Sequence, residues 1–144
     1  MKEKEFPVRK ICRIILHCSA TRENLPFSLE QLRQTHLEQG LGKIGYHFYV
    51  TRDGGVHSCL PLSEAGVHTK GFNRNSIGIC YEGGLDSKGN PADTRTQWQK
   101  SSLFDLVFAL KQTFPEAEVA GHSQLNGKMG RKCPCFDVKK EWNL

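Results

Sequence analysis

Short apolar runs that alternate with helical patterns are the feature that most limits how this chain can fold. Residues 12–18, 77–81 and 118–121 are largely apolar and short, which is typical of buried strands. One helical pattern follows Ser28, and a longer one begins at residue 94 or 96 and ends near residue 114. Because these strands and helices interleave, the sequence predicts an α/β fold with a central mixed β-sheet flanked by helices.

Local signals indicate where individual elements begin and turn. Ser28 is followed three residues later by Gln31, the pattern of a capping box at a helix N-terminus. Residues 46–60 alternate between apolar and polar side chains and are expected to form a hairpin that turns at residues 53–55. A last short helix is expected within residues 136–142. No internal repeat or linker interrupts this order.

Length and composition favour one soluble globular unit. The 144 residues fit one domain, which we predict to span residues 1–144 with a core at about 11–142. Hydrophobic residues make up 38% and charged residues 24%, as in ordinary globular proteins. No apolar run approaches the roughly 20 residues that cross a bilayer, and the N-terminus lacks the apolar region of a secretory signal. We therefore expect a monomer that is made in the cytoplasm and does not insert into membranes.

The net charge limits the classes of binding partner, and the setting of the cysteines indicates whether they are oxidised or reduced. The net charge of +5 is scattered along the chain, so it indicates a mild preference for acidic partners and does not predict nucleic-acid binding. The six cysteines are expected to be reduced thiols, because a cytosol does not favour disulfides. Cys12, Cys59 and Cys80 lie in strand-like stretches and are expected to pack in the core.

Three metal-competent residues occur in distinct local settings. His17 and His122 each follow a short apolar run, which places them at the rim of a core, and Cys133 begins a Cys-Pro-Cys segment. Two imidazoles and a thiolate suit a tetrahedral zinc with one position left for water, which is the arrangement of a hydrolytic zinc. A histidine near a strand is also often structural, and Cys-Pro-Cys can be two neighbouring thiols. The residues alone leave both interpretations open.

Longer segments around these residues carry a family resemblance. They are, in chain order, His17-Cys18-Ser19-Ala20-Thr21, Gly45-Tyr46-His47-Phe48, Arg52-Asp53-Gly54, His68-Thr69-Lys70-Gly71-Phe72-Asn73, Asn75-Ser76-Ile77-Gly78, Gly121-His122 and Cys133-Pro134-Cys135-Phe136-Asp137-Val138. Over residues 11–142 the chain resembles the zinc-dependent N-acetylmuramoyl-L-alanine amidases of the phage-lysozyme, AmpD and peptidoglycan-recognition-protein superfamily, and the short phage-type endolysins most of all. The resemblance implies Zn²⁺-dependent hydrolysis of the amide between N-acetylmuramic acid and L-alanine, in peptidoglycan or in soluble muropeptides.

The resemblance also implies roles for individual residues. It assigns His17, His122 and Cys133 as the zinc ligands, with Cys135 as the alternative thiolate two residues away. It assigns Tyr46 as a catalytic tyrosine that hydrogen-bonds the nucleophilic water or the substrate carbonyl. The alternative for Tyr46 is a structural residue whose hydroxyl lies at the rim of the sheet.

A catalytic cation is implied just before the ligand cysteine. The family places a lysine two residues before that cysteine, where it faces the developing oxyanion, and this position is Arg131 here. The preceding segment is longer than in the family pattern, so Lys128 and Lys132 are rival candidates. One fixed positive charge near the tetrahedral oxygen is the physical requirement.

A substrate-lining loop completes the implied site. His68, Lys70 and Asn73 match a family loop along the substrate groove. Asparagine and serine in such loops also stabilise turns through their own backbone, which is the alternative for Asn73 and Ser76.

Two other classes of function remain open at this point. The first is a non-catalytic peptidoglycan-binding module, although members that only bind often lack the ligand cysteine that this chain keeps. The second is a lysin that also restrains a phage RNA polymerase. The lack of a secretory signal fits either an endolysin that reaches the cell wall on lysis or a cytosolic enzyme of wall recycling.

Overall fold

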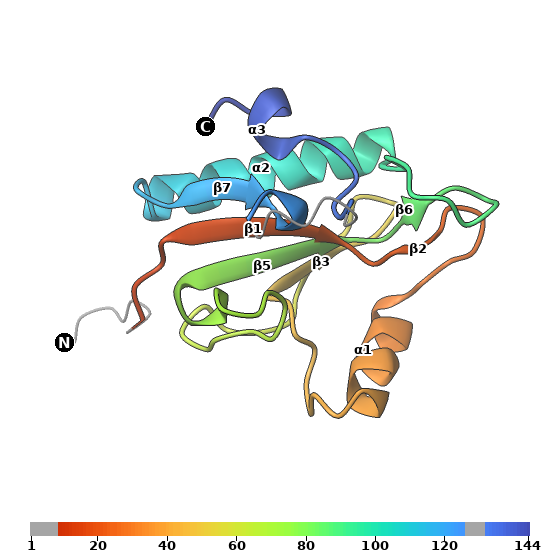
Figure 1. Cartoon of the computed structure of the whole chain (residues 1–144), viewed down its shortest axis with the longest axis horizontal. Helices are drawn as coiled ribbons and strands as arrows, with labels where there is room; N and C mark the ends of the chain where they lie inside the picture. The colour runs from red at the N-terminus through yellow and green to blue at the C-terminus, as the bar shows by residue number, and fades with distance from the viewer. Residues whose placement is uncertain (1–8, 126–131) are drawn as a thin grey trace.

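The computed structural model describes residues 9–125 and 132–144 of the chain (Figure 1). A five-stranded sheet with the order β4-β3-β5-β1-β7 forms its centre, and β2 and β6 form a separate pair. The elements are β1 (Arg13–Cys18), β2 (Thr21–Arg22), α1 (Leu29–Glu38), β3 (Phe48–Val50), β4 (Val56–Ser58), η1 (Asn73–Asn75), β5 (Ser76–Tyr81), β6 (Gly84–Leu85), α2 (Gln97–Thr113), β7 (Glu118–Gly121), η2 (His122–Gln124) and α3 (Val138–Glu141).

The central sheet is mixed, which confirms the predicted α/β architecture. Strand β1 lies between β5 and β7 and is parallel to both, and β3 is parallel to β5. Only the edge strand β4 is antiparallel, because the hairpin turn at residues 53–55 joins it directly to β3. The carboxyl ends of β1, β5 and β7 therefore meet along one edge of the sheet (Figure 1).

Helices cover both faces of the sheet. On one face Ile14 and Leu16 of β1 pack with Leu103 and Val107 of α2, and α3 lies on the same side (Figure 1). On the other face a smaller cluster joins Leu32 of α1 to residues of β3 and β5. Because side chains alternate along a strand, residues of β1 that do not face α2 point toward the α1 side.

The capping signals locate the helix starts correctly. Ser28 and Gln31 form the predicted capping box at α1. Thr96 and Gln99 form a second one at α2, so of the two expected starts it is residue 96 that caps the helix. The small β2–β6 sheet was not predicted, because strands of two residues leave no periodicity in a sequence.

The hairpin strands are shorter than the sequence pattern suggested. Regular strand pairing in β3 covers Phe48–Val50 only, so Tyr46 precedes the strand and does not lie within it. The return strand ends at Ser58. Beyond these limits the backbone bonds to loops, as where the Cys59 amide donates to the carbonyl of His47 at 2.8 Å. Alternation in residues 46–60 thus reflects two sides of a loop as well as two faces of a strand.

All six cysteines are free thiols in the structure. None of the six forms a disulfide. Cys80 is fully buried in the sheet, whereas Cys12 and Cys59 are only partly buried, so the prediction of three core cysteines is right for Cys80 alone. Within the described ranges no helix is both long enough and apolar enough to cross a membrane.

Candidate metal centre

Two histidines meet because their strands are paired neighbours. His17 is the second-last residue of β1, and His122 directly follows β7. The register pairs Leu16 with Gly121, so the next residue on each strand comes out at the same edge of the sheet. Both side chains are buried, and their ring centroids are 4.7 Å apart. The parallel pairing of β1 with β7 thus brings together two imidazoles that are far apart in the sequence.

The C-terminal segment brings a thiol to the same place. The hydroxyl of Tyr81 donates to the carbonyl of Pro134 at 2.6 Å, which fixes the segment against β5. Gly121 allows this approach, because a Cβ there would lie 2.7 Å from Pro134 Cδ. The backbone amide of Cys18 donates to Cys133 Sγ at 3.1 Å, and that sulfur lies 4.0 Å from His17 Nδ1.

The three donor atoms form a group that fits a metal ion. One ligand atom each from His17, His122 and Cys133 lie within 4.8 Å of one another. Two imidazole nitrogens and one thiol sulfur are the donors that zinc prefers, and three protein ligands leave a coordination position for water or substrate. Cys135 is directed elsewhere, since its sulfur lies 3.4 Å from the carbonyl oxygen of Gly84. The structure therefore favours Cys133 over Cys135 as the thiol of this group.

A buried arginine fastens the segment that carries the thiol. The Arg95 guanidinium donates to Asp93 at 2.9 Å and to Glu141 of α3 at 2.8 Å, and it lies over the ring of Phe136 at 3.4 Å. Only 1% of its side chain is exposed. Burial by itself lowers the pKa of Arg95, but the hydrogen bonds to both carboxylates outweigh it and raise that pKa, so the group stays charged. Sequence reasoning missed Arg95, because an arginine in a loop before a helix carries no local signal.

The ring of Tyr46 lies beside that of His17. Its ring centroid is 5.1 Å from that of His17, and its side chain is partly buried in the loop that precedes β3. Burial raises the pKa of the Tyr46 phenol well above its ordinary value. At neutral pH the hydroxyl is thus protonated and can donate a hydrogen bond.

The three residues expected to line the substrate groove, His68, Asn73 and Lys70, lie in different surroundings. His68 reaches the centre, where its Nδ1 lies 2.9 Å from His17 Nε2, and burial lowers the pKa of His68 to about 3. Asn73 instead accepts the backbone amides of His68 and Thr69 at 2.9 and 2.8 Å, which is the turn role that was its alternative. Lys70 is exposed at the surface. Thr69 was missed, although it is buried and its hydroxyl lies 3.2 Å from His17 Nε2.

The predicted catalytic cations are mostly beyond what the structure describes. Lys128 and Arg131 lie outside the described residues. Lys132 lies within them and is exposed. The choice among the three stays a prediction.

Known protein families and relatives match this chain over most of its length. The sequence profile of the N-acetylmuramoyl-L-alanine amidase family matches residues 7–136. The endolysin of Enterobacteria phage K11 is 38% identical over 141 residues, which cover 97% of this chain and 91% of that protein. The endolysin of Escherichia phage T7 is 39% identical over 129 residues, which cover 90% of this chain and 83% of that protein.

Solved structures share the fold. N-acetylmuramoyl-L-alanine amidase LysC from Clostridium intestinale URNW matches with a TM-score of 0.75 at 23% identity, over 94% of this chain and 87% of its own. The Ph2119 endolysin of a Thermus scotoductus bacteriophage matches with a TM-score of 0.71 at 26% identity, over 87% of this chain and 77% of its own. The likeness thus includes the arrangement of the sheet and its helices.

Proposed function

The chain belongs to the N-acetylmuramoyl-L-alanine amidase family, and we propose that it hydrolyses the amide between N-acetylmuramic acid and L-alanine with a zinc ion held by His17, His122 and Cys133. The observation that carries this proposal is the convergence of two imidazoles and one thiol within 4.8 Å at the carboxyl edge of the sheet. Ligands of α/β proteins bind at this edge in general.

The metal and the surrounding side chains have separate tasks. A bound zinc ion supplies a Lewis acid and makes water a better nucleophile near neutral pH. Tyr46 donates a hydrogen bond to the amide carbonyl or to the attacking water, because its raised pKa keeps the phenol protonated. A cation before Cys133 stabilises the oxyanion, with Arg131 as first choice, Lys128 as second and Lys132 as the third candidate.

The substrate and the setting follow from the same family membership. We take peptidoglycan or its muropeptides as the substrate, and the net charge of +5 suits stem peptides that carry carboxylates. Several relatives are phage endolysins, so we propose a monomer of one amidase domain, made in the cytoplasm and released to the wall on lysis. The thiol in the metal group argues against a module that only binds peptidoglycan.

A digestion experiment tests the activity and the metal together. Purified sacculi and soluble muropeptides are incubated with the protein, with and without a chelator, and the new termini are identified by mass spectrometry. We expect free lactyl carboxylates on muramic acid and free L-alanine amines, with no product when the metal is removed and recovery when zinc is returned. Glycan cleavage, or full activity in the presence of chelator, contradicts the proposal.

The identity of the thiolate ligand is tested by paired variants. Cys133→Ser is expected to lose zinc, whereas Cys135→Ser is expected to retain it, because only the Cys133 sulfur faces His17 Nδ1. Elemental analysis of dialysed protein measures the zinc content of each. The reverse ranking would move the ligand to Cys135.

A further inference from the structure

His17 uses its two ring nitrogens in different directions. Its Nδ1 faces the thiol of Cys133, at 4.0 Å from the sulfur. Its Nε2 faces away from the thiol and lies 2.9 Å from Nδ1 of His68. A neutral imidazole has one N–H donor and one acceptor, so a lone pair aimed at a metal from Nδ1 requires the proton on Nε2.

His68 is held in a position where it can accept that proton's hydrogen bond. Its Nε2 lies 3.3 Å from the hydroxyl of Ser76, so with Nδ1 as the acceptor the His68 proton is directed toward Ser76. The two histidine rings meet nearly edge to face, at an interplanar angle of 88°. Gly78 leaves room for the His68 ring, since a Cβ there would lie 2.6 Å from its Cδ2 atom.

Thr69 braces the same pair of nitrogens. Its hydroxyl lies 2.9 Å from His68 Nδ1 and 3.2 Å from His17 Nε2, and only 2% of the residue is exposed. Asn73 fixes the backbone of both His68 and Thr69 through their amides. Two neighbouring side chains of this loop, those of His68 and Thr69, therefore contact His17 Nε2.

We infer that His68 is a positioning residue that accepts a hydrogen bond from His17 Nε2 and so fixes the ring orientation and tautomer that presents Nδ1 to the metal. This inference rests on the proposed function, and it assigns His68 to the support of a ligand in place of the expected contact with substrate. Both ring nitrogens of His68 have partners inside the protein. Outer partners of metal-binding histidines typically change metal affinity by about 10- to 100-fold when removed.

Three substitutions at His68 separate this role from others. Asparagine places an amide oxygen where histidine has Nδ1, so His68→Asn can still accept from His17. Glutamine places its polar group near the Nε2 position instead, and His68→Gln loses that acceptor while keeping a polar side chain. His68→Ala removes both nitrogens. His57→Ala is the matched control, because His57 also contacts a hydroxyl, Thr51 Oγ1 at 3.2 Å, but belongs to the edge strand β4.

Zinc dissociation constants are measured by chelator competition, with melting of the metal-free protein as the check on folding. We expect the dissociation constant to rise about 10- to 100-fold in His68→Ala and His68→Gln, and to stay within about threefold of wild type in His68→Asn and His57→Ala. Melting of metal-free His68→Gln is expected to match that of His68→Asn, so a general loss of structure does not account for the difference.

Kinetic measurements on the same variants can contradict the positioning role of His68. If His68→Gln binds zinc as tightly as wild type and only KM for muropeptide rises, His68 contacts substrate and the inference is wrong. Equal zinc affinities in His68→Asn and His68→Gln would also overturn it, since the position of the acceptor would then be irrelevant. Failure of the wild-type protein to bind zinc is a separate outcome, which contradicts the proposed function itself.

Discussion

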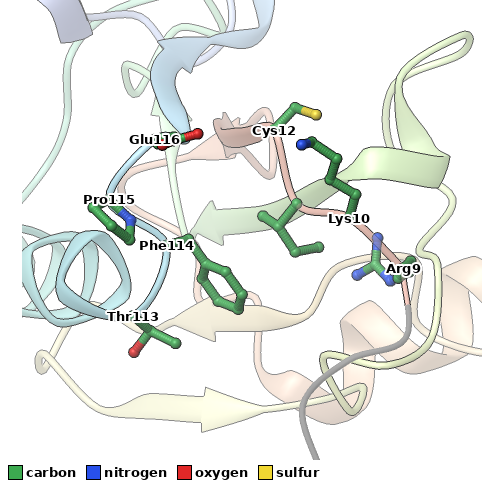
Figure 2. Close-up of a pocket in the computed structure, with 8 residues that line it drawn as sticks. Arg9, Lys10, Cys12, Thr113, Phe114, Pro115 and Glu116 are labelled. Atoms are coloured by element: carbon green, nitrogen blue, oxygen red, sulfur yellow. The ribbon is translucent and has the colours of Figure 1, made fainter.

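Polar side chains lie near both ends of β1, but only at the carboxyl end do their polar atoms point toward one another. At the amino end, a cavity of about 450 Å³ is lined by the segment just before β1 and by the end of α2 with the turn that follows it (Figure 2). Arg9, one of the two cations in its lining, donates to the backbone carbonyls of Leu62 and Ser76 at 3.0 and 2.9 Å. At the carboxyl end, His17, His122 and Cys133 direct their donor atoms at one another.

The difference shows that volume alone does not make a site. The guanidinium at the amino end has its hydrogen bonds directed into the protein, where it ties the chain to the β5 region. The groups at the carboxyl end are held by neighbours on one side, as His17 is by His68, while the other nitrogen faces the thiol. We expect a reactive site where several donor atoms point at one place and each side chain is held there by a hydrogen bond from behind.

Removal of a metal ligand is the strongest test of this contrast. We expect His17→Ala and His122→Ala to lose bound zinc and to reduce amidase activity by more than about 10⁴-fold, beyond the loss of a single acid–base group. Elemental analysis and digestion of sacculi measure the two effects. Full zinc occupancy in both variants would sink the assignment of the metal centre.

Tyr46→Phe removes one hydroxyl at the carboxyl end and leaves the ring in place. We expect zinc binding and folding to be unchanged and turnover to fall by about 10²–10⁴-fold, because a protonated phenol is lost beside the metal group. Turnover on a soluble muropeptide measures the effect. A rate within about threefold of wild type would leave Tyr46 as a structural residue.

The catalytic cation is expected to produce the next largest effect. Among Arg131→Ala, Lys128→Ala and Lys132→Ala, we expect one variant to lose about 10²–10³-fold in turnover with zinc retained, and the other two to change little. Arginine stays charged and can donate two parallel hydrogen bonds, which favours Arg131. Near wild-type turnover in all three would remove the cation from the mechanism.

Arg95→Met tests the fastening of the segment that carries Cys133. We expect the free energy of unfolding of the metal-free protein to fall by about 2 kcal/mol, because two carboxylates and an aromatic face lose their partner. The loss should be smaller than for a fully buried pair, since Asp93 and Glu141 are partly exposed and can be hydrated. Denaturant unfolding provides the measurement.

A surface ion pair is the control for Arg95. Lys139→Met removes one partner of Glu118, which keeps Arg13, and the side chains of Lys139 and Glu118 are nearly half exposed, so we expect a change below about 1 kcal/mol. Similar losses in Arg95→Met and Lys139→Met would show that the buried network does not stabilise the C-terminal segment more than a surface contact does.

Substitutions at the amino end are expected to have the smallest effects. Lys10 and Glu116 line the cavity of Figure 2 and are exposed. We expect Lys10→Ala and Glu116→Gln to change stability by less than about 0.5 kcal/mol and to leave turnover within about twofold. A tenfold loss of turnover in either variant would make the amino end part of the site and break the contrast between the two ends.

Periodicity and capping determined most of the fold from the sequence. The apolar runs of β1, β5 and β7 and the capping boxes at Ser28 and Thr96 depend on neighbours within a few residues, so they can be read locally. The extent of the hairpin was overestimated, because alternation continues into loops whose backbone bonds are made to distant segments. The β2–β6 pair was missed because each strand has only two residues, which is too short for a periodic pattern.

The sequence by itself also determined which residue types could carry the chemistry: the histidines that follow apolar runs, the cysteine before a proline, and Tyr46. The family resemblance ranked Cys133 above Cys135, and only the tertiary structure shows that the Cys133 sulfur faces His17 Nδ1 whereas the Cys135 sulfur lies beside the carbonyl of Gly84. It likewise placed His68 beside His17, and Arg95 between Asp93 and Glu141. Their hydrogen bonds join segments far apart in the chain, and such contacts form only when the sheet has brought its carboxyl edge together.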